Sequence, residues 1–327
     1  MKGTKLVRTT LDNSNILLFL VIFGVFGILA PRFLTLESFQ GIVTNSSYIG
    51  IVVVGMTFVL LTGGIDLSVG ANMYLAGVVV SILTVNLHLP IWVALLACIL
   101  EGVLFGLINA LAIVKLGILP FIVTLSTMVA GRGIAQQFTQ SQSITFPSSV
   151  TMMASTKLFG FISMPIVIFL LVVLLGHLFL TRTPGGRQVY AVGFNVESAR
   201  KAGINPNRIV FMTYVVSGAC AALGAFVSIA QIGEMNARYG TGEEFNAIAA
   251  AVLGGVSLFG GVGTVFPGVV LGTVMLQMIQ AGLVFTGVDL YIQPIIKAAI
   301  IYVALLFDSF RIGLLEKLNR RNIMARG

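Results

Sequence analysis

The stretch that decides the fold is residues 41–65, which read GIVTNSSYIGIVVVGMTFVLLTGGI without a charged side chain. A helix needs about 20 mostly apolar residues to cross roughly 30 Å of hydrocarbon, so this stretch is long enough to span a bilayer. Similar charge-free runs cover Ile16–Ala30 and Met164–Thr181. Because a helix satisfies its own backbone hydrogen bonds in lipid, we predict an all-α membrane protein that crosses the bilayer many times.

The composition agrees with this prediction. Of the 327 residues, 57% are hydrophobic and 9% are charged, whereas soluble domains carry about 25% charged residues. The 37 glycines suit membrane helices that approach one another closely. The regular apolar–polar alternation of membrane barrel strands is absent from the sequence. Cys98 and Cys220 lack metal-ligand spacing, so we expect no metal site.

Outward from the first stretch, the apolar runs predict about ten transmembrane helices. They occupy a transmembrane region over residues 15–310, between cytoplasmic tails at residues 1–14 and 311–327, of which the second is basic. The expected helices are Asn15–Ala30, Gly41–Thr62, Ala71–Asn86, Ile91–Val114, Leu119–Phe138, Ile162–Thr181, Ile209–Ile232, Phe245–Leu253, Val265–Phe285 and Tyr291–Phe307.

The distribution of Lys and Arg predicts the orientation, since cytoplasmic loops are enriched in both. With ten spans and both termini on one side, that side carries 14 of the 19 basic residues. The opposite side carries three: Arg32, Lys157 and Arg238. We therefore expect both termini and the polar loop 182–208 to be cytoplasmic. The net charge of +8 reflects this topology, and we expect no nucleic-acid partner.

The 182–208 loop is the most informative polar segment. Residues 196–202 predict a short helix, with Asn195 as its N-cap and Gly203 in the left-handed position that ends it. Its polar side carries charged residues, namely Glu197, Arg200 and Lys201. An ordinary solvated loop and a docking element for a soluble partner both fit this pattern.

Four motifs give the chain a resemblance to a known family. They are VGMTFVLLTGGIDLSVG (54–70), YAVGFN (190–195) with SARKAGI (198–204), EFNAIAAAVLGG (244–255) with SLFGGVG (257–263), and IKA (296–298). Together they resemble the permease subunits of bacterial ABC sugar importers of the ribose type. The chain departs from that pattern at Phe194, where the family commonly has a second Gly.

The resemblance implies a type II ABC importer fold in the bacterial inner membrane. Two permease chains, identical or homologous, would form the pathway for a ribose-like sugar. The implied partners are a cytoplasmic ATPase subunit and a periplasmic or lipid-anchored sugar-binding protein. No G-x-x-x-x-G-K-[ST] loop occurs in the chain, so we expect no enzyme activity and no cofactor in this chain, with ATP bound by the partner.

The resemblance implies the coupling element, whereas the other candidate site residues follow from their residue types and their expected positions in the topology. The coupling element to the ATPase would comprise Gly193, Asn195, Glu197, Ala199, Arg200, Lys201, Ala202, Gly203 and Ile204. Candidates for the pathway or its gate are Asn45, Asp66, Ser68, Asn72, Asn109, Gln136 and Asn246. Candidates for contact with the binding protein are Arg238, Glu243 and Glu244. For Asp66 and Ser68, capping of the following helix is the structural alternative.

Three alternatives remain open. The cargo of such an importer could be an autoinducer sugar or a nucleoside. A secondary transporter driven by an ion gradient would use carboxylates inside its helices, and Glu101 is the residue that supports it. A membrane-embedded enzyme would need a clustered catalytic group, which the isolated His88 and His177 do not supply.

Overall fold

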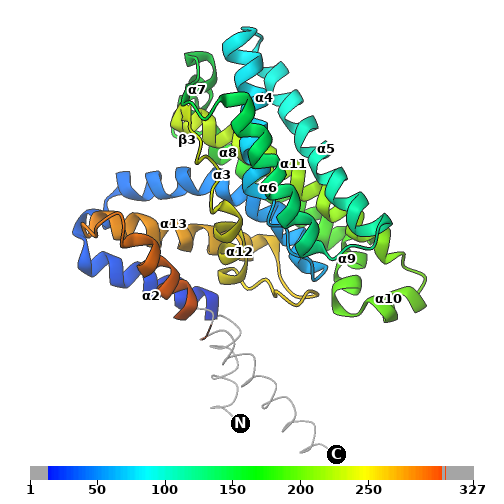
Figure 1. Cartoon of the computed structure of the whole chain (residues 1–327). Coiled ribbons are helices and arrows are strands. Elements are labelled where there is room, and N and C mark those ends of the chain that lie inside the picture. The colour runs from blue at the N-terminus through cyan, green and yellow to red at the C-terminus, as the bar shows by residue number, and fades with distance from the viewer. Residues whose placement is uncertain (1–13, 304–305, 307–327) are drawn as a thin grey trace, which may run out of the picture. The chain divides into compact units, whose positions relative to one another are not determined.

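The structure of the chain, a computed structural model, describes residues 14–303 and residue 306 (Figure 1). The predicted tails, apart from Ser14, lie outside the described residues. So do residues 304–305 and 307 at the end of the tenth expected helix.

The described residues form helices joined by loops and four short strands. In chain order the elements are α2 (Ser14–Leu29), η1 (Pro31–Leu34), α3 (Leu36–Leu61), α4 (Val69–Ser81), η2 (Ile82–Asn86), α5 (Ile91–Lys115), α6 (Pro120–Thr139), β1 (Ile144–Thr145), α7 (Ser148–Ser155), β2 (Lys157–Leu158), β3 (Ile162–Ser163), α8 (Met164–Arg182), α9 (Pro184–Phe194), α10 (Val196–Lys201), α11 (Pro206–Ile232), β4 (Glu234–Met235), α12 (Glu243–Leu253), η3 (Val265–Val269) and α13 (Val270–Phe285). A further apolar helix covers Gln293–Val303.

Helix occurs at each of the ten positions expected from the sequence, and six of these helices are long and apolar enough to cross a membrane. Among the described residues those six are Leu36–Leu61, Val69–Asn86, Ile91–Lys115, Met164–Arg182, Pro206–Ile232 and Val265–Phe285. The structure thus supports a helical membrane protein with several spans, while ten spans stay a prediction.

Four expected spans fall outside these six: Asn15–Leu29 and Gln293–Val303 are shorter apolar helices, and the other two differ for clear reasons. Helix α6 carries Arg132, Gln136 and Gln137, which lower its hydropathy. Helix α12 has 11 residues and is therefore about 16 Å long, roughly half of the hydrocarbon thickness.

The chain divides into two compact units. One unit comprises the described parts of Met1–Ile42 and Val274–Gly327, and the other comprises Val43–Thr273. In the first unit, the ring of Phe33 in η1 packs against Phe23 and Phe26 of α2, with ring centroids 5.8 and 5.9 Å apart. Gly282 of α13 leaves the space that the Phe26 ring occupies.

In the second unit, α5 and α11 cross with their backbones in contact. A methyl group on Gly218 of α11 would lie 2.9 Å from the backbone nitrogen of Gly106, and it would also meet the carbonyl oxygen of Gly102. Small residues four apart permit such close crossings of membrane helices. The thiol of Cys98 donates to the carbonyl oxygen of Ala222 across the same crossing, at 3.2 Å. Helix α4 packs against both α5 and α11.

One side of α5 faces away from the rest of the chain. Its exposed apolar residues recur every three or four positions: Trp92, Leu96, Leu100, Leu104, Ile108 and Leu111. This spacing places them on one face of a helix. An exposed apolar stripe on a helix of this length is the surface that lipid covers in a membrane protein.

The loops of the second unit gather at two places. Strand β1 pairs antiparallel with β4, and β2 pairs antiparallel with β3. Strands β1, β2 and β3 lie close in sequence to α7. Helices α9 and α10 lie at the lower right of Figure 1, and α7 lies at the upper left. The sequence did not predict α7 or α9, because both lie in segments interpreted as polar loops.

Candidate functional site

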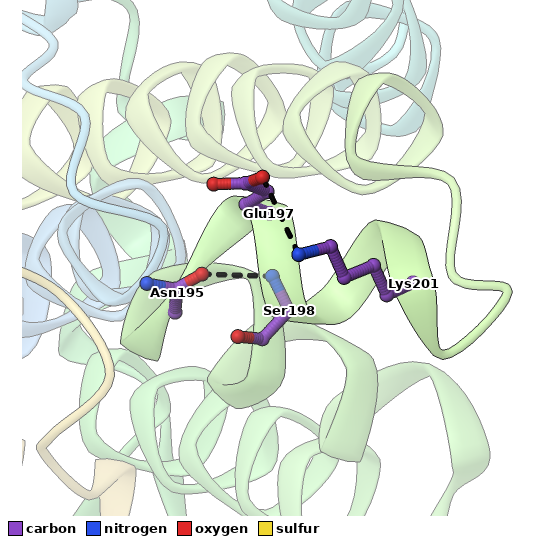
Figure 2. A network of polar contacts seen from close by, with 4 residues as sticks. All are labelled: Asn195, Glu197, Ser198 and Lys201. Atoms are coloured by element: carbon purple, nitrogen blue, oxygen red, sulfur yellow. Dashed lines mark hydrogen bonds and ion pairs between the residues drawn. The ribbon is translucent and has the colours of Figure 1, made fainter.

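Helix α10 confirms the short helix predicted within the 182–208 loop. The side-chain oxygen of Asn195 accepts a hydrogen bond from the backbone N–H of Ser198 at 2.8 Å, as Figure 2 shows. Gly203 follows with φ of +81°, and its backbone N–H donates to the carbonyl oxygen of Arg200. A side-chain cap at one end and a left-handed glycine after the other satisfy backbone groups that a six-residue helix would otherwise leave to water.

The surface of α10 is almost entirely exposed. Glu197 and Lys201 form an ion pair of 3.5 Å on its outer side, visible in Figure 2, and their side chains are 79% and 78% exposed. Arg200 and Ala202 are exposed as well, whereas Ala199 is buried and attaches the helix to its neighbours. Because exposed ion pairs contribute little to stability, these charged groups are available to a partner.

Helix α9 supports α10 and begins at a well-defined cap. The Thr183 hydroxyl accepts a hydrogen bond from the Gly186 N–H at 3.1 Å, and Pro184 occupies the first turn. At its other end, the phenol of Tyr190 donates to the carbonyl oxygen of Gly263 at 2.9 Å. Burial raises the pKa of this phenol above its ordinary value, so its proton is retained for that bond.

Gly193 places the coupling element against two glycine-rich turns. A methyl group at Gly193 would overlap the carbonyl oxygen of Leu61, at the end of α3, and would lie 2.5 Å from the backbone nitrogen of Gly261. The Gly261 N–H in turn donates to that Leu61 carbonyl at 2.9 Å. We call the contact of Leu61, Gly193 and Gly261 the glycine junction. It joins α9, α3 and the 254–263 stretch through backbone atoms alone.

A groove lies beside the glycine junction. It has a volume of about 430 Å3 and is lined by Tyr190, Ala191, Phe194, Asn195, Ser198, Ala199, Ala202, Ile204 and Gly261. Several of these are coupling candidates, so the structure brings that part of the predicted site together.

The first glycine-rich turn contains a buried polar network around Asp66. Its Oδ1 accepts hydrogen bonds from the backbone N–H and the hydroxyl of Ser68 at 3.0 and 2.5 Å, and its Oδ2 accepts one from Ser217 at 2.8 Å. Asn109 donates to the Ser68 hydroxyl oxygen at 2.8 Å, and Thr127 donates to the Asn109 side-chain oxygen at 2.8 Å. The network therefore connects the turn with α5, α6 and α11.

The network corrects the capping alternative for Ser68. Ser68 precedes α4, but its side chain caps no backbone N–H of that helix and donates to Asp66 instead. The Asp66 carboxylate, in contrast, accepts the backbone N–H of Ser68 at the start of the helix. Asp66 is 2% exposed. Burial raises the pKa of its carboxyl above the ordinary value, and the hydrogen bonds from Ser68 and Ser217 oppose that rise. The donors follow one another from Thr127 to Asn109, from Asn109 to Ser68 and from Ser68 to Asp66, and Ser217 also donates to Asp66, so that Asp66 is the final acceptor.

The remaining pathway candidates occupy different environments. Asn72 is buried and donates to the carbonyl oxygen of Gly218 at 3.0 Å. Asn45 is exposed, and Gln136 and Asn246 are half-buried. The structure thus brings Asp66, Ser68 and Asn109 into one network but does not bring all seven candidates together.

The candidates for contact with a binding protein lie at and before the start of α12. Arg238 is exposed, and Glu243 is half-buried and accepts from Tyr48 at 3.3 Å and from Asn246 at 3.2 Å. Glu244 is buried against Gly70. The three therefore do not form one exposed patch, because Glu244 points inward.

Sequence reasoning missed four side chains that support these sites: Thr127, Tyr190, Tyr214 and Ser217. Tyr214 donates to the carbonyl oxygen of Ile65 at 3.2 Å, which holds the first glycine-rich turn from α11. For Thr127, Tyr214 and Ser217, a hydroxyl group within an apolar helix was the signal that could have found them, since it needs a hydrogen-bond partner in lipid or protein interior. Tyr190 lies outside the apolar runs and offered no such signal. Within the described part of the chain, no three His, Cys, Asp or Glu residues could together hold a metal ion.

Comparison with known proteins gives consistent matches over most of the chain. The profile of the family described as "Branched-chain amino acid transport system / permease component" matches residues 38–307. The galactofuranose transporter permease protein YtfT of Escherichia coli K12 is 37% identical over 284 residues, which cover 86% of this chain and 82% of that protein.

Two further relatives come from the same strain. The ribose import permease protein RbsC is 33% identical over 307 residues, which cover 91% of this chain and 94% of that protein. The D-allose transport system permease protein AlsC is 34% identical over 290 residues, with 88% of each chain covered. No solved structure matches the chain.

Proposed function

We propose a specific role for α10 from the premise that this chain belongs to the family of permease components of carbohydrate-uptake ABC transporters: it is the element on which the ATPase subunit acts. Membership of the family makes the chain a transport subunit that is not itself catalytic, with ATP bound by a partner ATPase. It also implies a sugar-binding protein as a second partner.

The observation that carries this proposal is the exposure of a helix that is closed at both ends. Asn195 and Gly203 satisfy the ends of α10, while its charged residues face outward. Gly193 then connects this element by backbone contact to the end of α3. A partner that moves α10 would therefore move the end of a membrane helix directly.

For the membrane topology, we propose ten spans with both termini cytoplasmic. The transmembrane region would cover residues 15–310, with the cytoplasmic coupling segment at 182–208. The excess of Lys and Arg on one side supports this orientation. The separation of α9 and α10 from α7 in Figure 1 agrees with loops on opposite faces of a membrane.

For the assembly and cargo, we propose a pair of permease chains in the bacterial inner membrane that imports a ribose-like monosaccharide. The named cargoes of the three relatives, galactofuranose, ribose and allose, are all sugars. The binding protein, periplasmic or lipid-anchored, would select the cargo, and the ligand it binds would distinguish ribose from an autoinducer sugar or a nucleoside.

Among the pathway candidates, burial divides the roles. Because Asp66, Ser68 and Asn109 are engaged with one another, we propose that they position the first glycine-rich turn, and that Asn72 positions α4 in the same way. The more accessible candidates, Asn45, Gln136 and Asn246, are better placed to meet a sugar. Arg238 and Glu243 are likewise the accessible candidates for contact with the binding protein.

The substitution Gly203→Val tests the docking role of α10. A β-branched residue at φ of +81° costs about 1–3 kcal/mol of backbone strain, so we expect distortion of the helix end and loss of uptake and of transport-stimulated ATP hydrolysis in reconstituted vesicles. Gly160→Val is the matched control, because Gly160 has φ of +80° and equally open surroundings between β2 and β3.

Normal uptake by the Gly203→Val protein would contradict the docking role. Omission of the ATPase provides the second test: uptake driven by an ion gradient through the permease alone would instead establish a secondary transporter. Hydrolysis of ATP by the pure permease would contradict its assignment as a subunit without an ATP site.

A further inference from the structure

Two phenylalanine side chains beside α10 are unusually exposed. Phe194, the last residue of α9, is 83% exposed, and Phe259, in the second glycine-rich stretch, is 92% exposed. Neither residue lies in one of the candidate membrane spans of the described chain. Single exposed apolar residues are normal on a protein surface, but several that lie together outside the lipid mark an interaction surface.

The turn that carries Phe259 is held in one conformation. The Phe259 N–H donates to the Ser257 hydroxyl oxygen at 3.1 Å, and the Ser257 N–H donates to the Val262 carbonyl at 2.8 Å. Gly260 and Gly261 both adopt left-handed backbone conformations, with φ of +87° and +71°. A side chain presented by an ordered turn loses little conformational freedom on binding, which favours affinity.

The segments that carry the two rings are in contact. A methyl group on Gly261 would lie 2.9 Å from the backbone nitrogen of Phe194, so the turn and the end of α9 touch at the backbone. The groove of about 430 Å3 opens at this contact and includes Ala199, Ala202 and Ile204 in its lining. The phenol of Tyr190 and the side-chain oxygen of Asn195 in that lining are already engaged in hydrogen bonds within the chain, and most of the other lining residues are apolar. The groove is therefore suited to apolar side chains rather than to a sugar.

We propose that Phe194, Phe259 and the groove lined by Phe194 and Gly261 extend the ATPase contact surface of α10 to the 257–262 turn. The proposal rests on the proposed function of α10, because it extends the same interface to the 257–262 turn. Aromatic residues are enriched at the centres of protein interfaces.

The charges around the surface indicate what the ATPase should present. The charged residues of the 182–208 segment, which carries Phe194 and α10, are Arg182, Arg187, Glu197, Arg200, Lys201 and Arg208, so positive charge dominates. The complementary face is an apolar centre with acidic residues at its rim. A membrane surface also attracts aromatic and basic residues. A groove beside an ordered turn, however, is a cavity that a side chain of a protein partner can fill, which favours a protein over a membrane.

The contact would give the ATPase a second connection to the membrane helices. Gly261 is hydrogen-bonded to Leu61 at the end of α3, so a partner holding Phe259 holds that helix end through the turn. Helix α10 reaches the same residue through Gly193. Two contacts of the partner would thus converge on one point of the permease.

Binding measurements with the assembled transporter test this surface. Phe259→Ala and Phe194→Ala permeases in lipid nanodiscs should each bind the ATPase about 5- to 30-fold more weakly than wild type, the loss typical of an interface residue that matters. Phe161→Ala is the matched control, because Phe161 is similarly exposed in the turn between β2 and β3. It should bind the ATPase as wild type does.

A photo-crosslinking residue at position 259 gives a direct readout that does not depend on affinity. A covalent adduct with the ATPase polypeptide supports the proposal, provided that position 161 gives none. An adduct with lipid alone, or unchanged ATPase affinity in both alanine variants, overturns it.

The outcome also separates this inference from the function of α10. If Gly203→Val weakens ATPase binding while both phenylalanine variants bind normally, α10 docks the ATPase and the extension of the interface to the 257–262 turn is wrong. If none of the three variants weakens binding, the docking role of α10 is wrong as well.

Discussion

The coupling element and the first glycine-rich turn meet at Leu61, yet they are stabilised in opposite ways. Helix α10 is exposed, and local caps at its two ends hold it. The turn around Asp66 is buried, and side chains from three other helices hold it. Because α10 is exposed and is stabilised by its own caps, a soluble partner can bind it or leave it without disturbing the buried helices. A buried network fixes the position of the helices on which that element acts.

The contact between the two regions is the most sensitive point to break. In Gly193→Ala, the new methyl group would overlap the Leu61 carbonyl, and because a Cβ has no rotamers, no side-chain rotation can relieve this clash with the backbone. We expect a loss of about 3 kcal/mol or more, seen as loss of the monodisperse protein in size-exclusion chromatography. Gly133→Ala in α6 is the control, since a methyl group there meets open space. Equal yields of the two variants would contradict the tight contact.

Removal of the Asp66 carboxylate should disturb the buried region next most strongly. Asp66→Ala leaves the hydroxyls of Ser68 and Ser217 without their acceptor, and each buried unsatisfied group costs about 1–3 kcal/mol. Asp66→Asn keeps an acceptor and removes the charge, so it should unfold at a temperature close to wild type. A larger loss from Asp66→Asn than from Asp66→Ala would contradict the network as described.

The pH dependence of unfolding tests the burial of the Asp66 carboxyl in a second way. Because burial raises the pKa of Asp66 in the folded protein, its contribution to stability is present at low pH and is lost as pH rises through the folded pKa. Wild type should therefore lose stability relative to Asp66→Asn as pH increases. Thermal unfolding of both proteins in nanodiscs at several pH values measures this difference, and a difference that grows in favour of wild type would refute the assignment.

Tyr190→Phe tests the link between the regions with a smaller change. It removes the hydrogen bond to Gly263 and keeps the ring, at a cost of about 1 kcal/mol. We expect normal ATPase binding but weaker stimulation of ATP hydrolysis by transport. Tyr291→Phe should have no effect, because that ring is exposed. Reduced binding without a change in coupling would show that the Tyr190 hydroxyl serves the ATPase contact rather than the link to Gly263.

The smallest effect is expected on the outer side of α10. Lys201→Gln breaks the ion pair with Glu197. The side chains of Lys201 and Glu197 are both mostly exposed. Such pairs contribute little because solvent screens them, so thermal unfolding should be unchanged. A measurable shift in unfolding temperature would show that α10 is held by its charges as well as by its caps.

The sequence predicted α10 well because the signals for a capped helix are local. Asn195 and Gly203 lie next to the residues they cap, and both act as expected. The network could not be predicted in the same way, since Asp66 and Ser217 are 151 positions apart. A buried hydroxyl such as that of Thr127 needs a hydrogen-bond partner, and the partner depends on which helices pack together in the fold.

The overall fold was predictable for a similar reason. Apolar runs indicated helix at the right positions, because the hydrocarbon thickness sets their length. Helix α9 was missed, although Thr183 and Pro184 form a recognisable helix start. The glycine junction could not be predicted from the sequence either, since a glycine that contacts a distant backbone has the same sequence signature as a glycine in open space.

The glycine junction also determines which forces the permease can transmit. Pressure on α9 is resisted at once, since Gly193 already touches the Leu61 carbonyl. Tension is resisted by two hydrogen bonds, from Tyr190 to Gly263 and from Gly261 to Leu61. The glycine junction therefore resists both pushing and pulling. The coupling element of α9 and α10 could thus transmit a push to α3 in one half of a transport cycle and a pull in the other.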